Sequence, residues 1–408
     1  MDQIEAINYT EINNPKKISW FSIGLYFPIM LSTFAFSFYI ENKMFAFRLI
    51  SVIGAILFYV NILANFKKKY LYNRADILLK FYILILAFLI CTSIKFNLKD
   101  LVSLFIYPFS SLAFTIAIVA LNQRKDAFTQ LMLIVRLVNN LYLVLFLIDY
   151  LVTTGQPFVT LRFSYFILFE FIFFPELSSS RKLYITFLYI FLMVMAKVFD
   201  ERTMVIRCFA MGGLLIIFYN FQFFRVKFFK FLAVIAVIAI CIGIAFYFNE
   251  IFGFVTNFIS SKTVDTSDTR SFLLVEFFQD FKNKDWIAGR GYLGTYYSQF
   301  FQDYKGDGGD SSTRFTIEIG LFDILLKGGL LMLIPFVIIY LKALWRGFVN
   351  SSFNTIYFRL SLYLMVEFML LAIENFPGFT VNYMLMWCAI GIILNKKNID
   401  GNLNKTNS

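Results

Sequence analysis

The chain contains no histidine among its 408 residues. Histidine is the commonest general base near neutral pH and the commonest metal ligand in proteins, so both kinds of site are excluded in their usual form. Any chemistry that this protein performs must therefore use carboxylates, arginines, hydroxyl groups or the backbone.

Cysteines are also few, and all four of them, at positions 91, 208, 241 and 388, lie within apolar segments. Their spacing fits neither a disulfide framework nor a zinc site. Asp307 and Asp310 are the acidic residues of a glycine-rich segment, which is typical of a solvated turn rather than of a metal site. We therefore expect no metal and no cofactor.

Charged residues make up only 15% of the chain, whereas hydrophobic residues make up 59%. Such a composition is typical of a polytopic membrane protein. The net charge of +11 comes from short Lys and Arg clusters between apolar runs, a pattern that indicates membrane topology and not a nucleic-acid-binding face. We expect membrane lipid, and no nucleic acid, among the partners.

Apolar runs long enough to cross a bilayer as helices recur along the whole chain. They lie near residues 20–40, 44–64, 77–94, 101–121, 128–150, 161–177, 183–199, 203–221, 228–249, 315–341, 355–374 and 379–394. The sequence therefore predicts an all-α polytopic membrane protein with about 12 transmembrane helices, forming one integral membrane domain over residues 1–408.

Basic gaps between these runs alternate with gaps that are poor in positive charge. Cytoplasmic loops are enriched in Lys and Arg, so this alternation places both termini in the cytoplasm. The long polar interval over residues 250–314, between spans nine and ten, is then extracytoplasmic. In a bacterium it would be a periplasmic loop of an inner-membrane protein.

The long loop is expected to carry helices. Ser267 and Asp268 are typical of a helix N-cap, and the apolar residues that follow up to Phe281 recur at helical spacing, which predicts an amphipathic helix on the outer membrane surface. A second helix is predicted to begin near residues 311–312 and to continue into span ten. That helix would place Arg314 and Glu318 one turn apart on one face.

The segment 289–294 reads GRGYLG and matches the dinucleotide-binding pattern G-x-G-x-x-G. That pattern requires a preceding strand and a following helix in a βαβ unit, and neither is predicted here. Two interpretations stay open: a tight turn, or a turn whose backbone amides and Arg290 approach an anionic ligand.

Arginines are the strongest candidates for ligand binding. In the predicted topology, Arg48, Arg162 and Lys197 lie on the outer side together with the five arginines that we take as site candidates: Arg202, Arg207, Arg270, Arg290 and Arg314. Planar guanidinium groups bind phosphate oxygens in pairs, so a converging set of them suits a lipid carrier with a diphosphate headgroup. Each one also has a simpler interpretation, because an arginine near the end of a span can reach the lipid headgroups.

Glu318 is the candidate catalytic carboxylate, with Arg314 as its neighbour. It would accept a proton from a sugar hydroxyl while arginines hold the leaving diphosphate. The alternative is that Arg314 and Glu318 form a structural ion pair. Arg136 and Glu170 have opposite charges in the middle of spans, and we expect them to form a structural pair inside the bundle.

The chain resembles the Wzy-type O-antigen and capsule polymerases, and more broadly the O-antigen ligase-like superfamily. The resemblance depends on the many spans with one large late loop, on Arg202, on Arg270 with Trp286, and on the segments 289–296 (GRGYLGTY) and 314–329 (RFTIEIGLFDILLKGG). It implies a GT-C-like architecture in the bacterial inner membrane and glycosyl transfer without a metal.

The implied activity is polymerisation of undecaprenyl-diphosphate-linked oligosaccharide repeats into O-antigen, capsule or related exopolysaccharide. By position, Arg202, Arg270, Arg290 and Arg314 correspond to the arginines of the family that handle diphosphate or glycan. The implied partners are the lipid-linked oligosaccharide, a chain-length regulator and a flippase of the same pathway.

Three alternatives remain. An O-antigen ligase would transfer glycan to the lipid A core, but ligases usually carry a histidine near the start of the span after the loop, where this chain has Glu318. A transporter or flippase for lipid-linked oligosaccharide would need charged residues through to the inner side of the membrane. An assembly partner without catalytic activity would need only the charged loop.

The predicted topology is testable with single cysteines at Lys305 and Lys397, in a chain whose native cysteines have been replaced by serine. In intact spheroplasts, a membrane-impermeant maleimide should label position 305 and not position 397, because only the first lies outside the cytoplasm in this topology. Labelling at position 397 alone would reverse the orientation.

Overall fold

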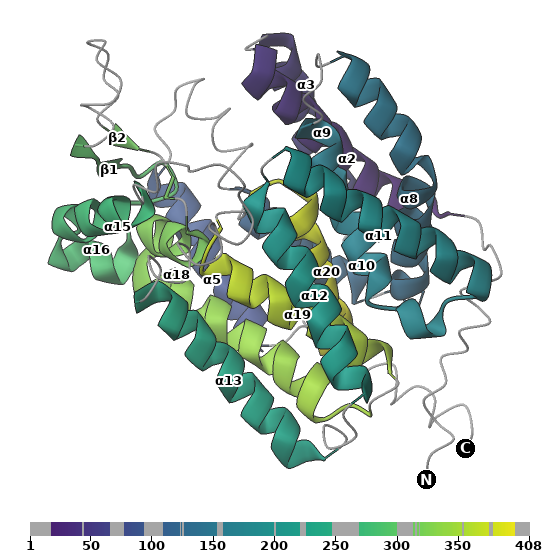
Figure 1. Ribbon diagram of the computed structural model, residues 1–408. Helices are drawn as coiled ribbons and strands as arrows, with labels where there is room; N and C mark the ends of the chain where they lie inside the picture. Colours follow the sequence, from purple (N-terminus) through teal and green to yellow (C-terminus); the bar gives the residue numbers. More distant parts are fainter. Residues whose placement is uncertain are drawn as a thin grey trace.

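The computed structural model describes most of residues 18–395. The described part omits residues 43–44, 66–76, 94–108, 123, 125, 153–157, 200, 221–225, 247–268, 300–312, 315, 318, 353–354 and 375–377. Within it the chain forms a bundle of helices with a small separate group of elements at one end of α18 (Figure 1).

Each of the predicted apolar runs contains a helix. Eleven of the runs match α2 (Trp20–Asn42), α3 (Phe45–Asn65), α5 (Ile77–Ser93), α7 (Phe109–Leu121), α8 (Ala127–Val152), α11 (Ser179–Val198), α12 (Arg202–Asn220), α13 (Lys227–Phe246), α18 (Gly320–Leu344), α19 (Ile356–Leu371) and α20 (Val381–Leu394). The run over 161–177 instead breaks into α9 (Phe158–Phe163), α10 (Tyr165–Phe171) and the 3-10 turn η1 (Phe174–Glu176), and a π-helical turn, η3 (Trp345–Val349), follows α18.

Three described helical segments are long and apolar enough to cross a membrane: Ala127–Leu151, Thr203–Asn220 and Gly320–Val349. Several shorter apolar helices accompany them. The described residues are thus predominantly helical and of the membrane-protein type, with one short two-stranded sheet. The number of crossings and the orientation in the membrane stay predictions.

The centre of the bundle consists of α19 and α20. Every residue of α20 is buried, as is nearly every residue of α19. A helix that is buried on all sides is surrounded by other helices, and the charged residues of α19, Arg359 and Glu367, have their partners there. In Figure 1 both helices lie among α10, α12 and α18.

Small side chains allow α2 and α3 to pack closely. The hydroxyl groups of Ser32 and Ser51 are 2.7 Å apart and hydrogen-bonded. A Cβ atom added to Gly54 would lie 2.7 Å from the carbonyl oxygen of Pro28. Close backbone approach through small residues is typical of helix pairs in membranes.

Several of the basic segments meet at one end of the bundle. The Lys230 ammonium, near the start of α13, donates to the carbonyl oxygen of Ser351 at 2.7 Å. Arg346 donates to the carbonyl oxygen of Leu394 at 3.2 Å, at the end of α20. The start of α13 and the ends of α18 and α20 are therefore close together, as expected if they share one side of the membrane.

A buried carboxylate, Glu170, has two arginine partners. Arg181 donates to both of its oxygens at 2.8 and 2.7 Å, and the Arg136 guanidinium lies 3.4 Å away. Asn139 donates to Glu170 at 2.8 Å. The structural pair predicted for Arg136 and Glu170 is therefore present, and Arg181, which the sequence indicates only as a topology signal, makes the stronger contact.

Removal of the charge on Glu170 is predicted to destabilise the fold. Glu170→Gln keeps the side-chain volume but leaves two guanidiniums without their counter-charge, and loss of one partner from a buried pair costs about 3–5 kcal/mol. Thermal unfolding of the purified protein in one detergent measures the effect.

The matched control is Asp126→Asn, in the Arg124–Asp126 pair, whose side chains are 31% and 37% exposed. Solvent-exposed pairs contribute about 0–1 kcal/mol, so this change should shift unfolding little. Equal shifts for the two variants would contradict a structural role for the Glu170 pair.

Candidate functional site

The long loop folds into a small unit on α18, which we call the loop subdomain. Its described elements are α15 (Thr269–Asp280), α16 (Asn283–Ala288), β1 (Tyr296–Tyr297) and β2 (Thr313–Arg314). The strands pair antiparallel, with Tyr296 opposite Arg314. A separate apolar cluster fills the unit and joins it to α18; its buried members are Phe277, Phe281, Tyr296, Ile317, Leu325 and Leu326.

This arrangement confirms one predicted helix and corrects the other. A helix does form over the predicted amphipathic segment, as α15, although the predicted N-cap at 267–268 lies outside the described residues. The predicted helix from residues 311–312 into span ten is wrong, because Arg314 lies in β2 and α18 begins only at Gly320. Arg314 therefore does not share a helix face with Glu318, which itself lies outside the described residues.

The predicted orientation of α15 also changes. The apolar face that the spacing assigns to the membrane carries Phe277 and Phe281, and both are buried in the cluster on α18. Protein side chains therefore cover this face, because α18 and the strands supply enough apolar surface to bury it.

Arg290 holds the loop subdomain together. Its guanidinium donates to the carboxylate of Asp285 at 2.9 Å, to the carboxylate and the carbonyl oxygen of Asp280, and to the carbonyl oxygen of Thr295 at 2.9 Å. One arginine thus joins the end of α15, the whole of α16 and the start of the strand segment.

The same hydrogen bonds shift the pKa values of Asp280 and Arg290. Partial burial acts to raise the pKa of Asp280, but hydrogen bonds from Arg290 and from the Tyr297 amide outweigh it and leave that pKa below its usual value. Burial likewise acts to lower the pKa of Arg290, and its bonds to Asp280 and Asp285 reverse the effect. Both groups are therefore held in their charged forms.

In the GRGYLG segment, the backbone of the loop comes into direct contact with the backbone of α18; we call this contact the glycine joint. Gly289 has a φ of +67°, and a Cβ atom there would lie 2.6 Å from the amide nitrogens of Gly328 and Gly329. Gly329, at φ +59°, interrupts the helical geometry of α18 at this contact. Gly291, at φ +80°, would place a Cβ atom 2.5 Å from the hydroxyl of Ser93 at the end of α5.

The backbone amides of this segment are used within the protein. Arg290 N–H donates to the carbonyl oxygen of Leu326 at 2.8 Å, and Tyr292 N–H donates to the hydroxyl of Ser93 at 2.9 Å. Gly289 and Gly294 donate to carbonyl oxygens within the loop. Of the two interpretations left open by the sequence, the tight turn therefore fits better than an anion-binding turn.

Two charged residues of α18 fix the loop subdomain further. The Lys327 ammonium donates to the carbonyl oxygen of Gly294 at 2.9 Å, and an oxygen of Asp323 accepts the Ile317 amide at 3.3 Å. Both side chains are buried. The start of α18 thus binds the loop before the strands, at Gly294, and after them, at Ile317.

A second charged group lies inside the bundle, around Arg207 of α12. Its guanidinium is fully buried, 3.3 Å from the carboxylate of Glu367 on α19, and it donates at 3.0 Å to Glu374. It also lies over the ring of Tyr165, 4.7 Å from its centroid. Of the two acids, Glu367 is fully buried, whereas the Glu374 side chain keeps 16% exposure.

This group connects directly to the start of α18. The carbonyl oxygen of Glu374 accepts the amide of Gly320 at 3.2 Å. Gly320 is two residues beyond Glu318 in the sequence. Arg207 and the start of α18, which follows Glu318 in the sequence, therefore belong to one region, although more than 100 residues separate them along the chain.

Arg207 is engaged by carboxylates of the protein itself, Glu367 and Glu374. Arg162 also lies within electrostatic range of Glu374 and Glu201, and the side chain of Arg202, next to Glu201, lies outside the described residues. Arg207 is therefore better suited to position acids than to bind a diphosphate.

The remaining predicted site residues are placed only in part. Arg202 begins α12 and Arg270 lies in the first turn of α15, but their side chains lie outside the described part of the structure. Arg314 is partly exposed on β2. The proposed roles of these three arginines and of Glu318 stay predictions.

Sequence reasoning missed Glu367, Glu374, Asp323 and Lys327. A signal for Glu367, Asp323 and Lys327 was present, because a charged residue within an apolar run indicates a paired or functional group. The same rule identified Glu170 from the sequence. Glu374 sits at the end of its run and carries no such signal.

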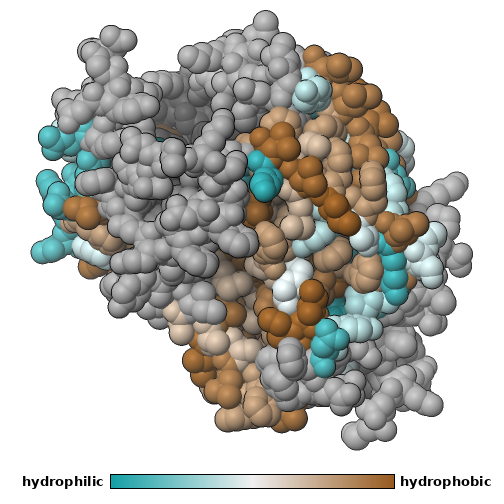
Figure 2. Space-filling model, in the orientation of Figure 1, coloured by the Kyte–Doolittle hydropathy of each residue, from teal (hydrophilic) through white to brown (hydrophobic). Residues whose placement is uncertain are grey.

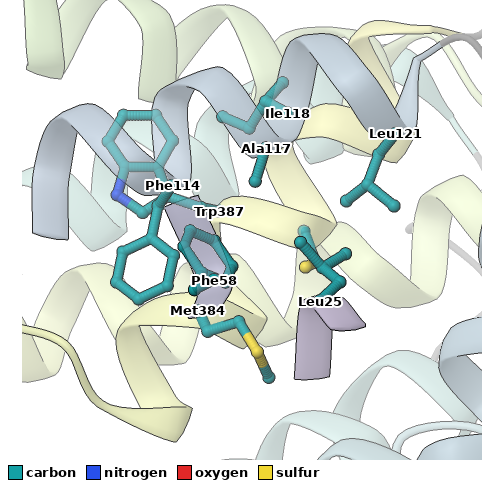
Figure 3. Close-up of a pocket in the computed structure, with 9 residues that line it drawn as sticks. Leu25, Phe58, Phe114, Ala117, Ile118, Leu121, Met384 and Trp387 are labelled. Carbon is teal, nitrogen blue, oxygen red and sulfur yellow. The ribbon is translucent and has the colours of Figure 1, made fainter. Parts of the chain in front are cut away.

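Within the described part of the chain, these residues form no metal site, and they do not line the apolar pocket between α2, α3, α7 and α20. Among the described residues, no group of three or more acidic or cysteine side chains could hold a metal ion, and Asp307 and Asp310 lie outside them. Figure 3 shows an apolar pocket between α2, α3, α7 and α20, and its lining includes Leu25, Phe58, Phe114 and Trp387. It contains none of the predicted site residues.

Comparisons of this chain with protein-family models, with curated proteins and with solved structures find no match.

The glycine joint is predicted to be intolerant of a side chain. Gly289→Ala combines a backbone conformation that costs about 1–3 kcal/mol for residues other than glycine with contact against the backbone of α18. Thermal unfolding should show a loss of stability, and limited proteolysis should cut the loop faster.

Gly213 in α12 provides the control, since a Cβ atom there meets nothing within 4 Å. Alanine in a helix interior is favoured over glycine by roughly 0.5–1 kcal/mol, so Gly213→Ala should leave stability unchanged or slightly higher. A Gly289→Ala protein as stable as wild type would contradict the close backbone contact between Gly289 and α18.

Proposed function

We propose that this protein is a membrane glycosyltransferase that polymerises undecaprenyl-diphosphate-linked oligosaccharide repeats. The observation that carries the proposal is the group formed by Arg207, Glu367 and Glu374 beside the start of α18. It supplies carboxylates where the predicted topology puts the outer side of the membrane, next to the segment that resembles the polymerase family.

The proposed chemistry needs a proton acceptor and a held leaving group. The acceptor hydroxyl oxygen forms a bond to the anomeric carbon of the donor sugar, while the bond from that carbon to the diphosphate oxygen breaks. The hydroxyl proton passes to a carboxylate, Glu318 or Glu374, and the electron pair of the broken bond leaves with the undecaprenyl diphosphate. General base catalysis of this kind contributes typically 10²–10⁴-fold to a rate.

The arginines divide into two roles in this proposal. Arg207 and Arg290 already donate to carboxylates of the protein, so they position the acids and the loop subdomain. Arg202, Arg270 and Arg314 are the residues that we assign to the diphosphate, because a guanidinium binds two phosphate oxygens at once. The absence of histidine favours polymerase over ligase.

A transporter of lipid-linked oligosaccharide is the second candidate, and one observation favours it. Buried charges are present away from the Arg207 group as well: Glu170 bonds Arg181, and Glu176 lies 3.1 Å from Arg359. In both cases an arginine faces a carboxylate at short distance, as Arg207 does. The Arg207 group differs in its place, because among the described residues of these groups only its Glu374 is bonded to the start of α18, in the segment that resembles the polymerase family. The polymerase therefore remains the first proposal.

The experiment supplies purified protein in proteoliposomes with its lipid-linked repeat unit. We expect a ladder of products, and we expect it to survive EDTA. Glu318→Gln and Glu374→Gln are compared, and the one that removes the proton acceptor should lower the initial rate by about 10²–10⁴-fold, because the amide cannot accept the proton. Glu374→Asp should retain part of the activity, and size-exclusion elution checks that each variant is folded.

Asp126→Asn, in the exposed Arg124–Asp126 pair, is the control and should polymerise at the wild-type rate. A single transfer to lipid A core would identify a ligase, and translocation without a new glycosidic bond would identify a transporter. Either result from the wild-type protein would overturn the proposal.

A further inference from the structure

The loop subdomain carries an exposed apolar patch, which we call the loop patch. Its members are Val275 and Phe278 of α15 and Ile287 of α16, with exposed fractions of 54%, 40% and 61%. In Figure 2, hydrophobic residues interrupt the hydrophilic surface over these helices. Large apolar side chains gathered on one surface mark an interaction site more often than scattered ones do.

The loop patch is not the face of α15 that packs inside the subdomain. Phe277 and Phe281 are buried in the apolar cluster with α18, whereas Val275 is 54% exposed. Phe278 lies at the edge of the cluster: its ring contacts Phe277, Trp286 and Phe322, and 40% of it remains exposed. One side of the two helices is therefore covered by the protein, and the other is only partly covered by the described part of the chain.

The loop patch lies close to an exposed apolar stripe of α18, although residues 323–329 between their contacts on that helix are buried. The ring of Phe278 contacts Phe322 near the start of that helix, with centroids 5.3 Å apart. The backbone of Ile287 lies against Gly329, where a Cβ atom would be 2.4 Å from the Ile287 carbonyl oxygen. The exposed stripe begins at the next residue and consists of Leu330, Leu331, Ile334 and Ile338.

That stripe belongs to the helical segment Gly320–Val349, which is long and apolar enough to cross a membrane. Exposed Leu and Ile side chains on such a helix face lipid, because water would disfavour them. The occupant that covers the stripe is therefore the bilayer. Ile287 lies against Gly329, one residue before the stripe begins, and this proximity puts the loop patch at the edge of the same bilayer.

Charge next to the loop patch fits this location. Lys282 and Lys284 are exposed on the segment that leads into and begins α16, and Lys284 lies one turn before Ile287 on the same side of that helix. Amphipathic helices that lie in the membrane interface combine apolar residues with lysines, whose ammonium groups reach the anionic headgroups.

We propose that the loop patch is inserted into the boundary between headgroups and acyl chains of the leaflet that faces the loop. The loop subdomain is then anchored twice, by its glycine joint to α18 and by its own side chains to lipid. This inference does not depend on the proposed enzymatic function. A soluble partner or a second copy of the chain would give different results in the test below.

The test uses the full-length chain with its native cysteines replaced and one cysteine introduced at Ile287. The cysteine carries the environment-sensitive fluorophore NBD, and the protein is reconstituted into vesicles of phosphatidylcholine and phosphatidylglycerol. Some vesicles contain lipid with a nitroxide near the headgroup, at acyl carbon 5, and others contain lipid with a nitroxide at acyl carbon 12.

We expect blue-shifted emission at position 287 and several-fold stronger quenching by the carbon 5 nitroxide than by the carbon 12 nitroxide. Ile338→Cys, in the middle of the exposed stripe, should show the reverse order. Thr313→Cys, exposed on β2, is the control on the loop subdomain and should show water-like emission without quenching.

Water-like emission at position 287, equal to that at position 313, would overturn the proposal. Blue-shifted emission without quenching by either nitroxide would also overturn it, because a protein surface rather than lipid would then cover Ile287. Cross-linking through the cysteine at 287 would identify a second copy as that surface.

Discussion

Arginine keeps its charge in nearly every protein environment, so an arginine inside a helical bundle needs a carboxylate within reach. Arg207 meets Glu367 and Glu374, Arg181 meets Glu170, and Arg359 meets Glu176 in this way. Each pair joins segments that would otherwise be held only by apolar contacts. Because apolar side chains pack against lipid as readily as against each other, these pairs help to fix which helices are neighbours.

The loop subdomain is joined to the bundle by a different physical means. Glycines on both sides allow the backbone of the loop to touch the backbone of α18 at Gly328 and Gly329. Hydrogen bonds at Leu326 and Lys327 secure the contact. The loop therefore packs directly against the first half of α18. A ligand near Gly320 would lie close to both.

The hypothesis that five arginines bind a diphosphate changes once their contacts are known. The arginines of a predicted diphosphate clamp are a mixed set, because Arg207 and Arg290 are engaged with carboxylates of the protein. Glu374 is the partly exposed acid of the Arg207 group. In the proposed function a carboxylate accepts the proton, and the diphosphate is left to the other arginines.

The sequence by itself determined the helices, because a long apolar run or an apolar repeat at helical spacing stabilises a helix through local interactions. The positions of α2 to α8, of α11 to α13, of α15 and of the last three helices follow from this pattern, whereas the break of the run over 161–177 into α9 and α10 does not. The pairing of Arg136 with Glu170 was also predictable, since two opposite charges in adjacent apolar runs have few other partners.

Only the tertiary structure decided the strand at Arg314 and the late start of α18. A two-residue strand has no local signal and exists because Tyr296 offers it a partner. The same holds for Glu374, which reaches Arg207 across 167 residues of sequence. Contacts of this kind depend on how helices are arranged in space, and neither apolar periodicity nor charge counting along the chain contains that information.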